Sequence, residues 1–302
     1  MQNFGADQLG TLLALVEEGT FERAAARLHV TGSAVSQRVK AMEHAAGRVL
    51  VVRTTPVGLT EAGDVLLRHA RQVALLEADT ARALGGADGA GAVPMALAVN
   101  ADSLATWFLP ALAPVAADHD VVFELHREDQ ENTTSLLRSG TVLAAVTSTR
   151  EAVQGCLTTP LGAMRYRAVC SPAFAARWRG VHPTGSGVSW LQAAPVVAFD
   201  RTDDLQDAFL RRHVAGSAGG PRHHIPTSDD FARAIALGFG WGMLPELQCT
   251  DAIASGALVD VAPRSPVDVE LHWQRWNLAS PLLDAVTAAV RAAARTGLRR
   301  PR

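Results

Sequence analysis

The stretch Thr20 to Lys40, TFERAAARLHVTGSAVSQRVK, contains two short helical patterns separated by a turn at Thr31. In the second pattern the apolar residues Val35, Val39 and Met42 recur at i, i+4 and i+7, which is the spacing of one helical face. Polar residues lie on the opposite face. Two short helices arranged in this way predict a helix-turn-helix, whose second helix reads the major groove of DNA.

The polar face of the second helix carries groups that suit DNA. Serine and glutamine can hydrogen-bond to base edges, and arginine and lysine can reach phosphates or guanine. The alternative is the solvated face of an ordinary amphipathic helix. The candidate DNA-contacting residues here and in the segment that follows are Thr31, Ser33, Ala34, Ser36, Gln37, Arg38, Lys40, Arg53, Thr54 and Pro56.

The segments that follow favour the helix-turn-helix over an ordinary amphipathic helix. LVVRTTPVGLT, which is broken by Pro56 and Gly58, predicts a small hairpin or wing. From Thr60, a predicted N-cap, a helical pattern continues to Leu84 without proline. A long helix with a continuous apolar seam favours pairing with a copy of itself, and the alternative is packing on its own chain. The seam residues are Leu66, Ala70, Val73, Leu76 and Ala83.

The run from Leu9 to Leu84 resembles the DNA-binding domain of LysR-type transcriptional regulators. FERAAARLHVTGSAVSQRVKAMEHAAG is similar to that family's winged helix-turn-helix in order and spacing, and RTTPVGLTEAGDVLL is similar to its wing and the start of its linker helix. VLVVRT in place of the commoner Leu-Phe-x-Arg, with EDQENTTSLLRSGTVLAAVTS and CSPAFAARW, resembles the branch of lysine and arginine export regulators, LysG and ArgP. The family resemblance extends over essentially the whole chain.

Composition agrees with several domains. A chain of 302 residues with 48% apolar residues can bury two or three cores. The net charge is −2, and residues 1–90 hold nine Lys and Arg against ten Asp and Glu. This balance by itself argues against DNA binding. A dimer that presents a few cations per half-site nevertheless gains salt-dependent affinity. The one local positive cluster consists of Arg38, Lys40, Arg48 and Arg53 against Glu43.

Cysteine content and hydropathy indicate the compartment. Cys156, Cys170 and Cys249 are odd in number and unpaired in spacing, as expected in a reducing cytosol. The N-terminus has no charged-then-apolar signal pattern, and no run of about 18 apolar residues occurs. A cytoplasmic protein without a membrane partner is therefore expected.

The pattern changes after the small residues GGADGAGA, Gly85 to Ala92. Beyond them, short apolar runs alternate with helical patterns, which predicts parallel α/β layers. The predicted strands are MALAV (95–99), VVFELH (121–126), LAAVT (143–147), APVVAF (194–199), WGML (241–244) and VELHW (269–273).

The family resemblance implies that this second part folds as two α/β subdomains of periplasmic-binding-protein type, with a small effector in the cleft between them. The chain would cross near Thr158 to Met164 and return near Val269 to Asn277. The expected fold class is α+β overall. Its parts are a winged helix-turn-helix at 1–59, a linker helix and dimerisation hinge at 60–92, and an effector-binding domain at 93–302, with subdomain I at about 93–160 and 270–302 and subdomain II at about 161–269.

Polar residues follow the predicted strands, where ligands bind in parallel sheets. Serines at helix starts suit a carboxylate, whereas Glu124, Asp129 or Asp200 suits an ammonium or guanidinium group. A basic amino acid satisfies both ends. The alternative is that these residues are ordinary N-caps, and that Glu124 faces water. The candidate effector-binding residues are Asn100, Asp102, Ser103, Glu124, Asp129, Thr147, Asp200, Ser228 and Asp229.

Enzyme motifs are weak. GSGVS at 185–189 lacks the Gly-x-Ser-x-Gly spacing of a nucleophile elbow, and His223 with His224 lacks a partner at metal-ligand spacing. No catalytic residue, metal or cofactor is therefore expected.

The resemblance implies an activator of an exporter gene for basic amino acids. Its partners would be double-stranded DNA, an effector such as Lys, Arg or His, and further copies in a homodimer or homotetramer, with RNA polymerase as another candidate. Two alternatives stay open: a LysR-type regulator with a different small-molecule effector, and an effector-independent protein that binds nucleoid or replication-origin DNA.

Overall fold

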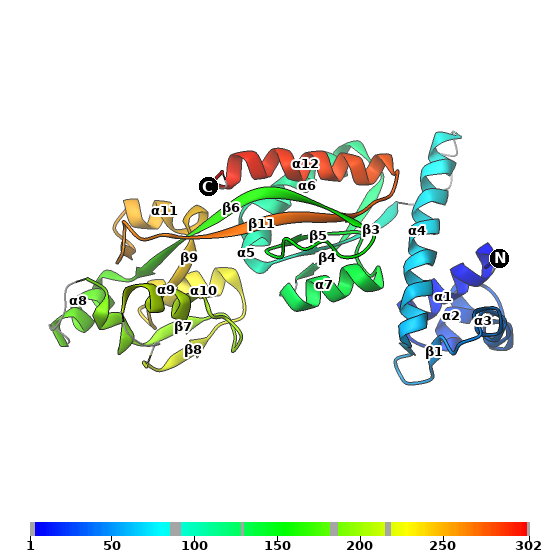
Figure 1. The fold of residues 1–302 in the computed structure, drawn as a ribbon, viewed down its shortest axis with the longest axis horizontal. Coiled ribbons are helices and arrows are strands. Elements are labelled where there is room, and N and C mark those ends of the chain that lie inside the picture. The colour runs from blue at the N-terminus through cyan, green and yellow to red at the C-terminus, as the bar shows by residue number, and fades with distance from the viewer. Residues whose placement is uncertain (1–3, 85–91, 128–129, 182–186, 215–218, 301–302) are drawn as a thin grey trace.

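The computed structural model describes residues 4–84, 92–127, 130–181, 187–214 and 219–300. Three short helices pack beside one half of a long upright helix at one end of the molecule (Figure 1). These elements are α1 (Ala6–Glu18), α2 (Phe21–Arg27), α3 (Gly32–Ala46) and α4 (Glu61–Ala83). The predicted helix-turn-helix is confirmed.

Local capping explains where these helices begin and end. The hydroxyls of Thr20 and Thr31 each accept a hydrogen bond of 3.2 Å from a backbone N–H in the first turn of α2 and α3. Gly19 and Gly47 follow α1 and α3 with φ of 72° and 63°, a left-handed conformation that glycine adopts without strain. Thr60 accepts from a backbone N–H at 3.1 Å, so its predicted role as an N-cap is confirmed.

The predicted wing is also present. Strand β1 (Val51–Val52) pairs antiparallel with β2 (Gly58–Leu59). The carboxylate of Glu43, on α3, accepts hydrogen bonds from the backbone N–H groups of Leu50 at 3.0 Å and Val51 at 3.3 Å. Glu43 therefore attaches the wing to the second helix of the motif instead of merely offsetting the local positive charge.

The rest of the molecule combines nine strands with helices. The strands are β3 (Val93–Val99), β4 (Val121–Arg127), β5 (Ala144–Thr147), β6 (Cys156–Cys170), β7 (Val196–Ala198), β8 (Arg222–His224), β9 (Gly242–Pro245), β10 (Val259–Asp260) and β11 (Val267–Trp276). The helices are α5 (Ala101–Ser103), a π-helical turn (Leu104–Phe108), α6 (Leu109–Asp118), α7 (Gln130–Ser139), α8 (Pro172–Val181), a 3₁₀ turn (Ser189–Gln192), α9 (Leu205–His213), α10 (Ser228–Ala236), α11 (Glu246–Ala254) and α12 (Pro281–Gly297). These counts refer to the described residues.

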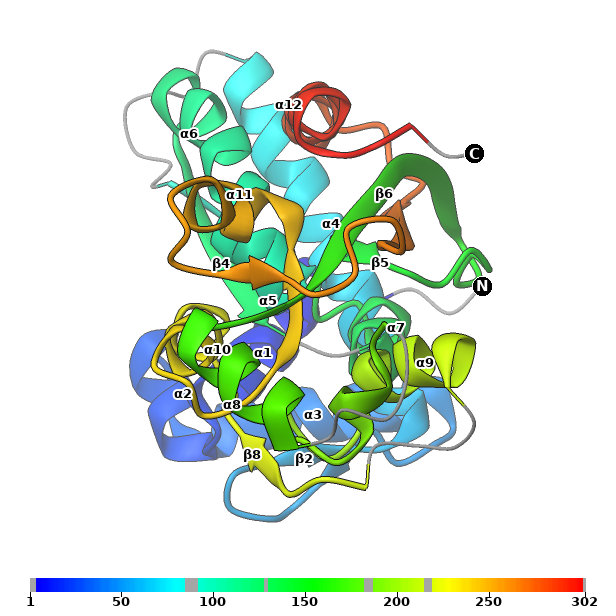
Figure 2. The same ribbon diagram turned by 90° about the vertical axis from the view of Figure 1, so that its left-hand side faces the viewer.

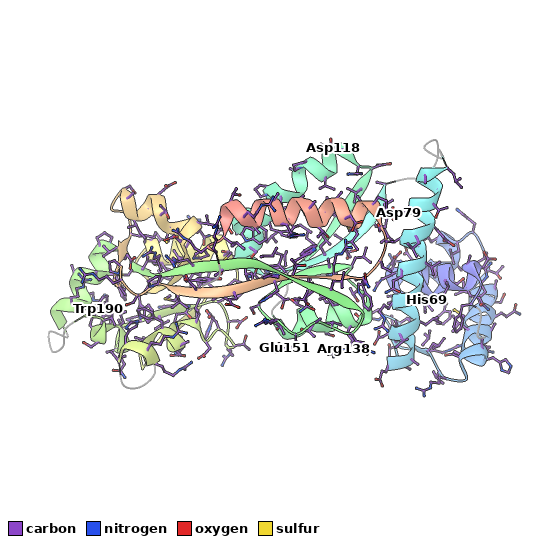
Figure 3. All side chains as sticks on the ribbon, turned by 45° about the horizontal axis from the view of Figure 1, so that its top comes forward. His69, Asp79, Asp118, Arg138, Glu151 and Trp190 are labelled. Atoms are coloured by element: carbon purple, nitrogen blue, oxygen red, sulfur yellow. The ribbon has the colours of Figure 1, made fainter. Side chains whose placement is uncertain are left out.

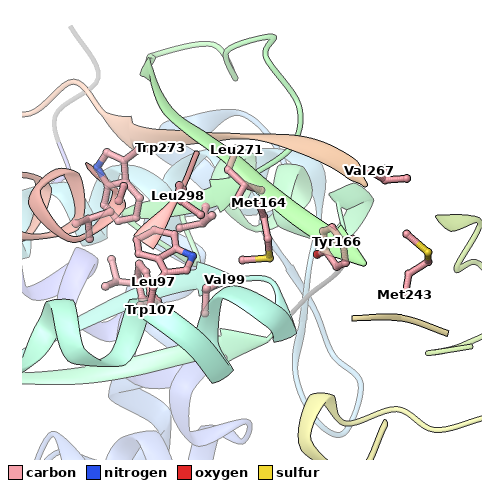
Figure 4. Close-up of a cluster of buried hydrophobic side chains, with 14 of the residues drawn as sticks. Leu97, Val99, Trp107, Met164, Tyr166, Met243, Val267, Leu271, Trp273 and Leu298 are labelled. Carbon is pink, nitrogen blue, oxygen red and sulfur yellow. The ribbon is translucent and has the colours of Figure 1, made fainter. Parts of the chain in front are cut away.

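The strands form two lobes, joined by the two longest of them (Figures 1 and 2). The main sheet has the order β10-β6-β11-β5-β3-β4, with β9 also paired to β6. In Figure 1, α6 and α12 lie above the sheet of the first lobe and α7 lies below it. The first lobe's core packs Trp107, Met164, Trp273 and Leu298 (Figure 4).

The expectation of a purely parallel arrangement is wrong in part. Strand β3 runs parallel to β4 and β5, and β7 runs parallel to β8. Strand β11, however, is antiparallel to β5 and β6, and β6 is antiparallel to β9 and β10. The reason is that the chain crosses to the second lobe along β6 and returns along β11. The pattern of residues did not predict the 15-residue β6 as one strand.

The apolar seam of α4 is largely covered by its own chain. Leu66 and Ala70 lie in the core of the N-terminal domain, and Val73 packs against that core. Leu75 instead lies in the core of the first lobe. Leu66 and Ala70 therefore fit the alternative that this helix packs on its own chain, whereas Leu76 is 39% exposed. None of the helices in the described ranges has both the length and the apolar character that a membrane span requires.

Candidate functional site

A buried carboxylate joins the two lobes. Asp102, on α5 of the first lobe, accepts a 2.8 Å hydrogen bond through Oδ1 from the Ser228 hydroxyl, which begins α10 in the second lobe. Its Oδ2 accepts a 2.8 Å hydrogen bond from the hydroxyl of Tyr166, on the crossing strand β6. Burial raises the pKa of Asp102, although both hydrogen bonds oppose that rise. Burial also raises the pKa of Tyr166 well above its usual value, and the nearby Asp102 carboxylate adds to the effect.

Two further predicted residues lie at the carboxyl ends of neighbouring strands. The side chain of Asn100 accepts a hydrogen bond of 3.3 Å from the backbone N–H of Ser103. The hydroxyl of Ser103 is fully buried and has no hydrogen-bond partner among the described residues. Thr147, at the end of β5, is buried and accepts from the backbone N–H of Thr149 at 3.1 Å. A buried hydroxyl without a partner beside a buried carboxylate suits a polar ligand.

The structure does not place Glu124 in this cluster. Glu124 lies in the middle of the edge strand β4 instead of at its carboxyl end, and its side chain is 68% exposed and 3.1 Å from the His126 imidazole. That expectation is wrong because strand alternation directs Glu124 outward.

The carboxylate of Asp200 closes its own loop. It accepts hydrogen bonds from the hydroxyl and backbone N–H of Thr202, both at 2.7 Å, and from the backbone N–H of Asp203 at 3.0 Å. The hydrogen bond from the Thr202 hydroxyl is the main reason that the pKa of Asp200 is lowered. Asp200 therefore stabilises its own loop and is not the N-cap of the following helix α9, which is Asp204. Asp229 is exposed on α10, 3.4 Å from the Gln248 amide, and Asp129 lies outside the described residues.

Tyr166 and Gln248 were not among the predicted site residues. Gln248, on α11, lies 3.4 Å from the Ser228 hydroxyl and donates to the Ser228 carbonyl at 3.3 Å. Tyr166 is the chain's single tyrosine, and it lies two residues beyond the predicted crossing segment, which ends at Met164. A lone phenol beside the segment expected to join the two lobes was the signal that could have pointed to it.

The second helix of the N-terminal motif presents the predicted polar face. Ser33, Gln37 and Lys40 are exposed on α3, whereas Val35 and Met42 are buried. Thr31 is exposed at the N-cap, its hydroxyl 2.8 Å from that of Ser33. Ala34 and Ser36 are half-buried on the same first turns.

Arg38 does not point freely outward with that face. Its guanidinium donates to the Thr11 hydroxyl at 3.1 Å and lies 3.5 Å from the carboxylate of Asp7, both on α1. Arg38 stays a predicted DNA contact, but α1 supplies it with partners that the local spacing did not reveal.

In the wing, Arg53, Thr54 and Pro56 are exposed. The guanidinium of Arg53 lies 5.2 Å from the ring centroid of Phe21, a cation–π geometry that holds the arginine beside α2. The Thr54 hydroxyl donates to the Pro56 carbonyl at 2.7 Å. The exposed face of α3 and the wing thus lie on one structural unit.

Comparisons with known proteins agree with this arrangement. Residues 6–64 match the model of the bacterial regulatory helix-turn-helix protein, lysR family, and residues 95–295 match the LysR substrate binding domain. The chain belongs to the LysR family of bacterial transcription regulators. This LysR-type regulator is a DNA-binding protein, and its family is one of transcription regulators, not of enzymes.

Its relatives place it in the LysG and ArgP branch. It is 44% identical over 292 residues to the lysine export transcriptional regulatory protein LysG of Corynebacterium efficiens, covering 96% of this chain and 98% of that protein. The crystal structure of ArgP from Mycobacterium tuberculosis superposes with a TM-score of 0.87 at 42% identity, covering 98% of both chains. Full-length LysG from Corynebacterium glutamicum with bound effector Arg gives a TM-score of 0.80 at 41% identity, covering 98% of this chain and 99% of that one.

Proposed function

We propose that this LysR-type regulator acts in the cytoplasm as an activator of an exporter gene for basic amino acids, and that Arg, Lys or His binds between its two lobes. The observation that carries the proposal is the buried Asp102 carboxylate, which is held by Ser228 from the opposite lobe and by Tyr166 from the crossing strand. The similar LysG structure contains bound effector Arg, and the similar C. efficiens protein is a lysine export regulator.

The site has the polarity that a basic amino acid requires. Asp102 supplies the negative charge for an ammonium or guanidinium group, and charge-assisted hydrogen bonds of this kind are strong in a buried site. The Ser103 hydroxyl, which has no partner among the described residues, and the backbone N–H groups in the first turn of α10 supply donors for a carboxylate. Because Asp102 and Ser228 lie in different lobes, a ligand that binds them changes how the lobes pack, which shifts the population of conformations.

A thermal-shift measurement of the full-length protein with each of the twenty amino acids tests the effector. A ligand at about 100 times its dissociation constant adds roughly 2.7 kcal/mol to the free energy of unfolding. We expect Arg, Lys or His to raise the melting temperature and neutral amino acids to leave it unchanged. Stabilisation by neutral or aromatic acids only, or no stabilisation by any amino acid, would refute the cationic effector.

On the DNA side, we propose that Ser33, Ser36 and Gln37 contact base edges, and that Lys40 and Arg53 contact phosphates, with Thr31, Ala34, Thr54 and Pro56 at the edges of the interface. Their support is the exposed face of α3 and the neighbouring wing. An effector-driven change in lobe packing would then alter the spacing or bend of DNA held by paired copies of α3.

Gln37→Ala and Arg53→Ala separate these two roles. We expect Gln37→Ala to weaken binding to an operator selected from a random DNA pool by about 1–3 kcal/mol, without weakening binding to unrelated DNA. We expect Arg53→Ala to weaken binding to both DNAs alike and to reduce the salt dependence of the affinity. Titrations at several salt concentrations measure both effects, and an unchanged footprint with Gln37→Ala would remove Gln37 from base readout.

We also propose a homodimer, or a tetramer built from two dimers, that pairs through α4. Val65 and Leu76, three turns apart on α4, are 52% and 39% exposed. On one helical face, exposed apolar residues at this spacing suit a second copy of the helix. We expect a sedimentation mass of two or four chains, and Leu76→Glu should shift it towards one. A mass that Leu76→Glu leaves unaltered would contradict pairing through this face.

A further inference from the structure

The long helix α4 belongs to two cores at once. Leu66 and Leu67 lie in the core of the N-terminal domain, whereas Leu75 lies in the core of the first lobe. Arg71 lies between these regions, and its charge interacts with Glu17 of α1 and Glu124 of β4. Because α4 is packed into the cores of both domains, a displacement of one domain moves the helix and, through it, the other domain.

One side chain of α4, that of Arg68, makes two contacts with the first lobe. The guanidinium of Arg68 donates a 2.8 Å hydrogen bond to the carbonyl of Arg138, at the end of α7. It also lies 5.0 Å from the ring centroid of Trp276, the last residue of β11. Figure 3 shows Arg138 beside the segment of α4 that carries His69. Trp276 is only 6% exposed, so the cation meets a ring that is mostly shielded from water, where such contacts are strongest.

Two glycines allow close approach at the contact of Arg68 with Arg138 and Trp276, which we call the joint. Gly140 has φ of +70°, and a Cβ there would lie 2.6 Å from Cγ and 2.7 Å from Cα of Arg68. Gly155 has φ of +87°, and a Cβ there would lie 2.7 Å from the ring of Trp276. Any other residue at either position would be strained and would also push the joint apart.

Strand β11 connects the contact of Arg68 and Trp276 with the Asp102 site. It begins beside the crossing, where Asp268 accepts hydrogen bonds from Arg165 at 2.7 and 2.8 Å, and it ends at Trp276. Between these points it pairs with β6, the strand that carries Tyr166, over its whole length. The ribbon of β6 and β11 is therefore continuous from the Asp102 site to the ring under Arg68.

We propose that Arg68 is the positioning residue that fixes the linker helix to the effector-binding domain, so that ligand binding between the lobes reaches the DNA-binding domain as a displacement of α4. The coupling part of this inference rests on the proposed effector. The joint itself does not depend on the proposed effector. It is formed by Arg68, Arg138, Gly140 and Trp276.

The test uses the full-length protein and operator DNA selected from a random pool. In the wild type, arginine should change the DNA affinity by a factor within the range of about 5 to 150 that is typical of allosteric coupling. In Arg68→Ala, arginine should bind with an unchanged dissociation constant, but its effect on DNA affinity should fall to less than about two-fold. Arg68→Lys, which keeps a cation over the ring, should restore part of the effect.

Gly140→Ala introduces a Cβ that would clash with Arg68, so this variant should also lose the effect of arginine on DNA affinity. Arg291→Ala, which removes an exposed arginine from α12, is the matched control and should respond like the wild type. A wild-type response to arginine in both Arg68→Ala and Gly140→Ala would overturn the proposal.

Hydrogen exchange separates failure of the joint from failure of the effector. If arginine leaves wild-type DNA binding unchanged, the proposed effector fails, and the joint is judged by exchange rates alone. We expect amides of residues 64–76 and 136–141 to exchange faster in both variants than in the wild type and Arg291→Ala. Unchanged exchange in these segments would overturn the joint as well.

Discussion

Asp102→Asn should abolish the response to basic amino acids and leave a folded protein. The substitution removes the negative charge that we assign to the cationic group of the effector. Loss of one partner from a buried, hydrogen-bonded charge pair costs about 2–5 kcal/mol or more. Because about 2 kcal/mol corresponds to about 30-fold in affinity, the effector's dissociation constant should rise by about 30-fold or more. Calorimetric titration with arginine measures it.

The stability of Asp102→Asn relative to the wild type should increase with pH. Burial raises the pKa of the Asp102 carboxyl, so the native state binds its proton more readily than the unfolded chain does. Its contribution to stability is therefore complete below the unfolded pKa and is lost as the pH rises through the native pKa. Asparagine does not titrate, so the melting temperature of Asp102→Asn relative to wild type should be higher at about pH 8 than at about pH 4.

Asp118→Asn is the control for both measurements, because Asp118 is an exposed aspartate on α6. It should bind arginine like the wild type. A variant at position 102 that keeps wild-type arginine affinity would show that Asp102 is a structural link between the lobes and no ligand for the effector.

Glu43→Ala should destabilise the N-terminal domain and weaken binding to every DNA sequence. The change removes the acceptor for the backbone N–H groups of Leu50 and Val51. Each partly buried donor left without a partner costs about 1–3 kcal/mol, so we expect the two donors together to cost about 2–6 kcal/mol. The wing would also lose its attachment to α3, and Arg53 would lose its position relative to the recognition helix.

Urea unfolding and DNA titration measure these two effects. Glu43→Gln keeps one acceptor oxygen and should recover part of both losses. Glu77→Ala, at an exposed site on α4, is the matched control for removal of a helical glutamate. Wild-type stability together with wild-type DNA affinity in Glu43→Ala would contradict the anchoring role.

Short-range patterns carried most of the N-terminal prediction. Val35, Val39 and Met42 are buried on α3, and Thr20, Thr31 and Thr60 cap the helices that they precede. Such features depend on residues within three or four positions of one another, so the order of residues is enough to predict them. Arg38 was the exception, since its partners Asp7 and Thr11 lie on a different helix.

The candidate effector site was predictable only in part. Asp102, Ser103 and Ser228 were expected because each follows a strand or begins a helix. Glu124 was expected for its charge, yet it lies in mid-strand and faces outward. Asp200 was expected for its place after a strand, yet its carboxylate caps its own loop. Charge and strand position alone therefore cannot separate a ligand from a cap.

The order of residues was enough to predict the winged helix-turn-helix, the long helix after it, the change to an α/β fold and the family, because each rests on local periodicity, capping or a contiguous motif. Three features became visible only in the folded molecule: Asp102, Tyr166 and Ser228 meet, β6 and β11 form one antiparallel ribbon, and α4 is shared by two cores. These contacts join residues far apart in the chain, and they follow from how the lobes pack, which no local pattern encodes.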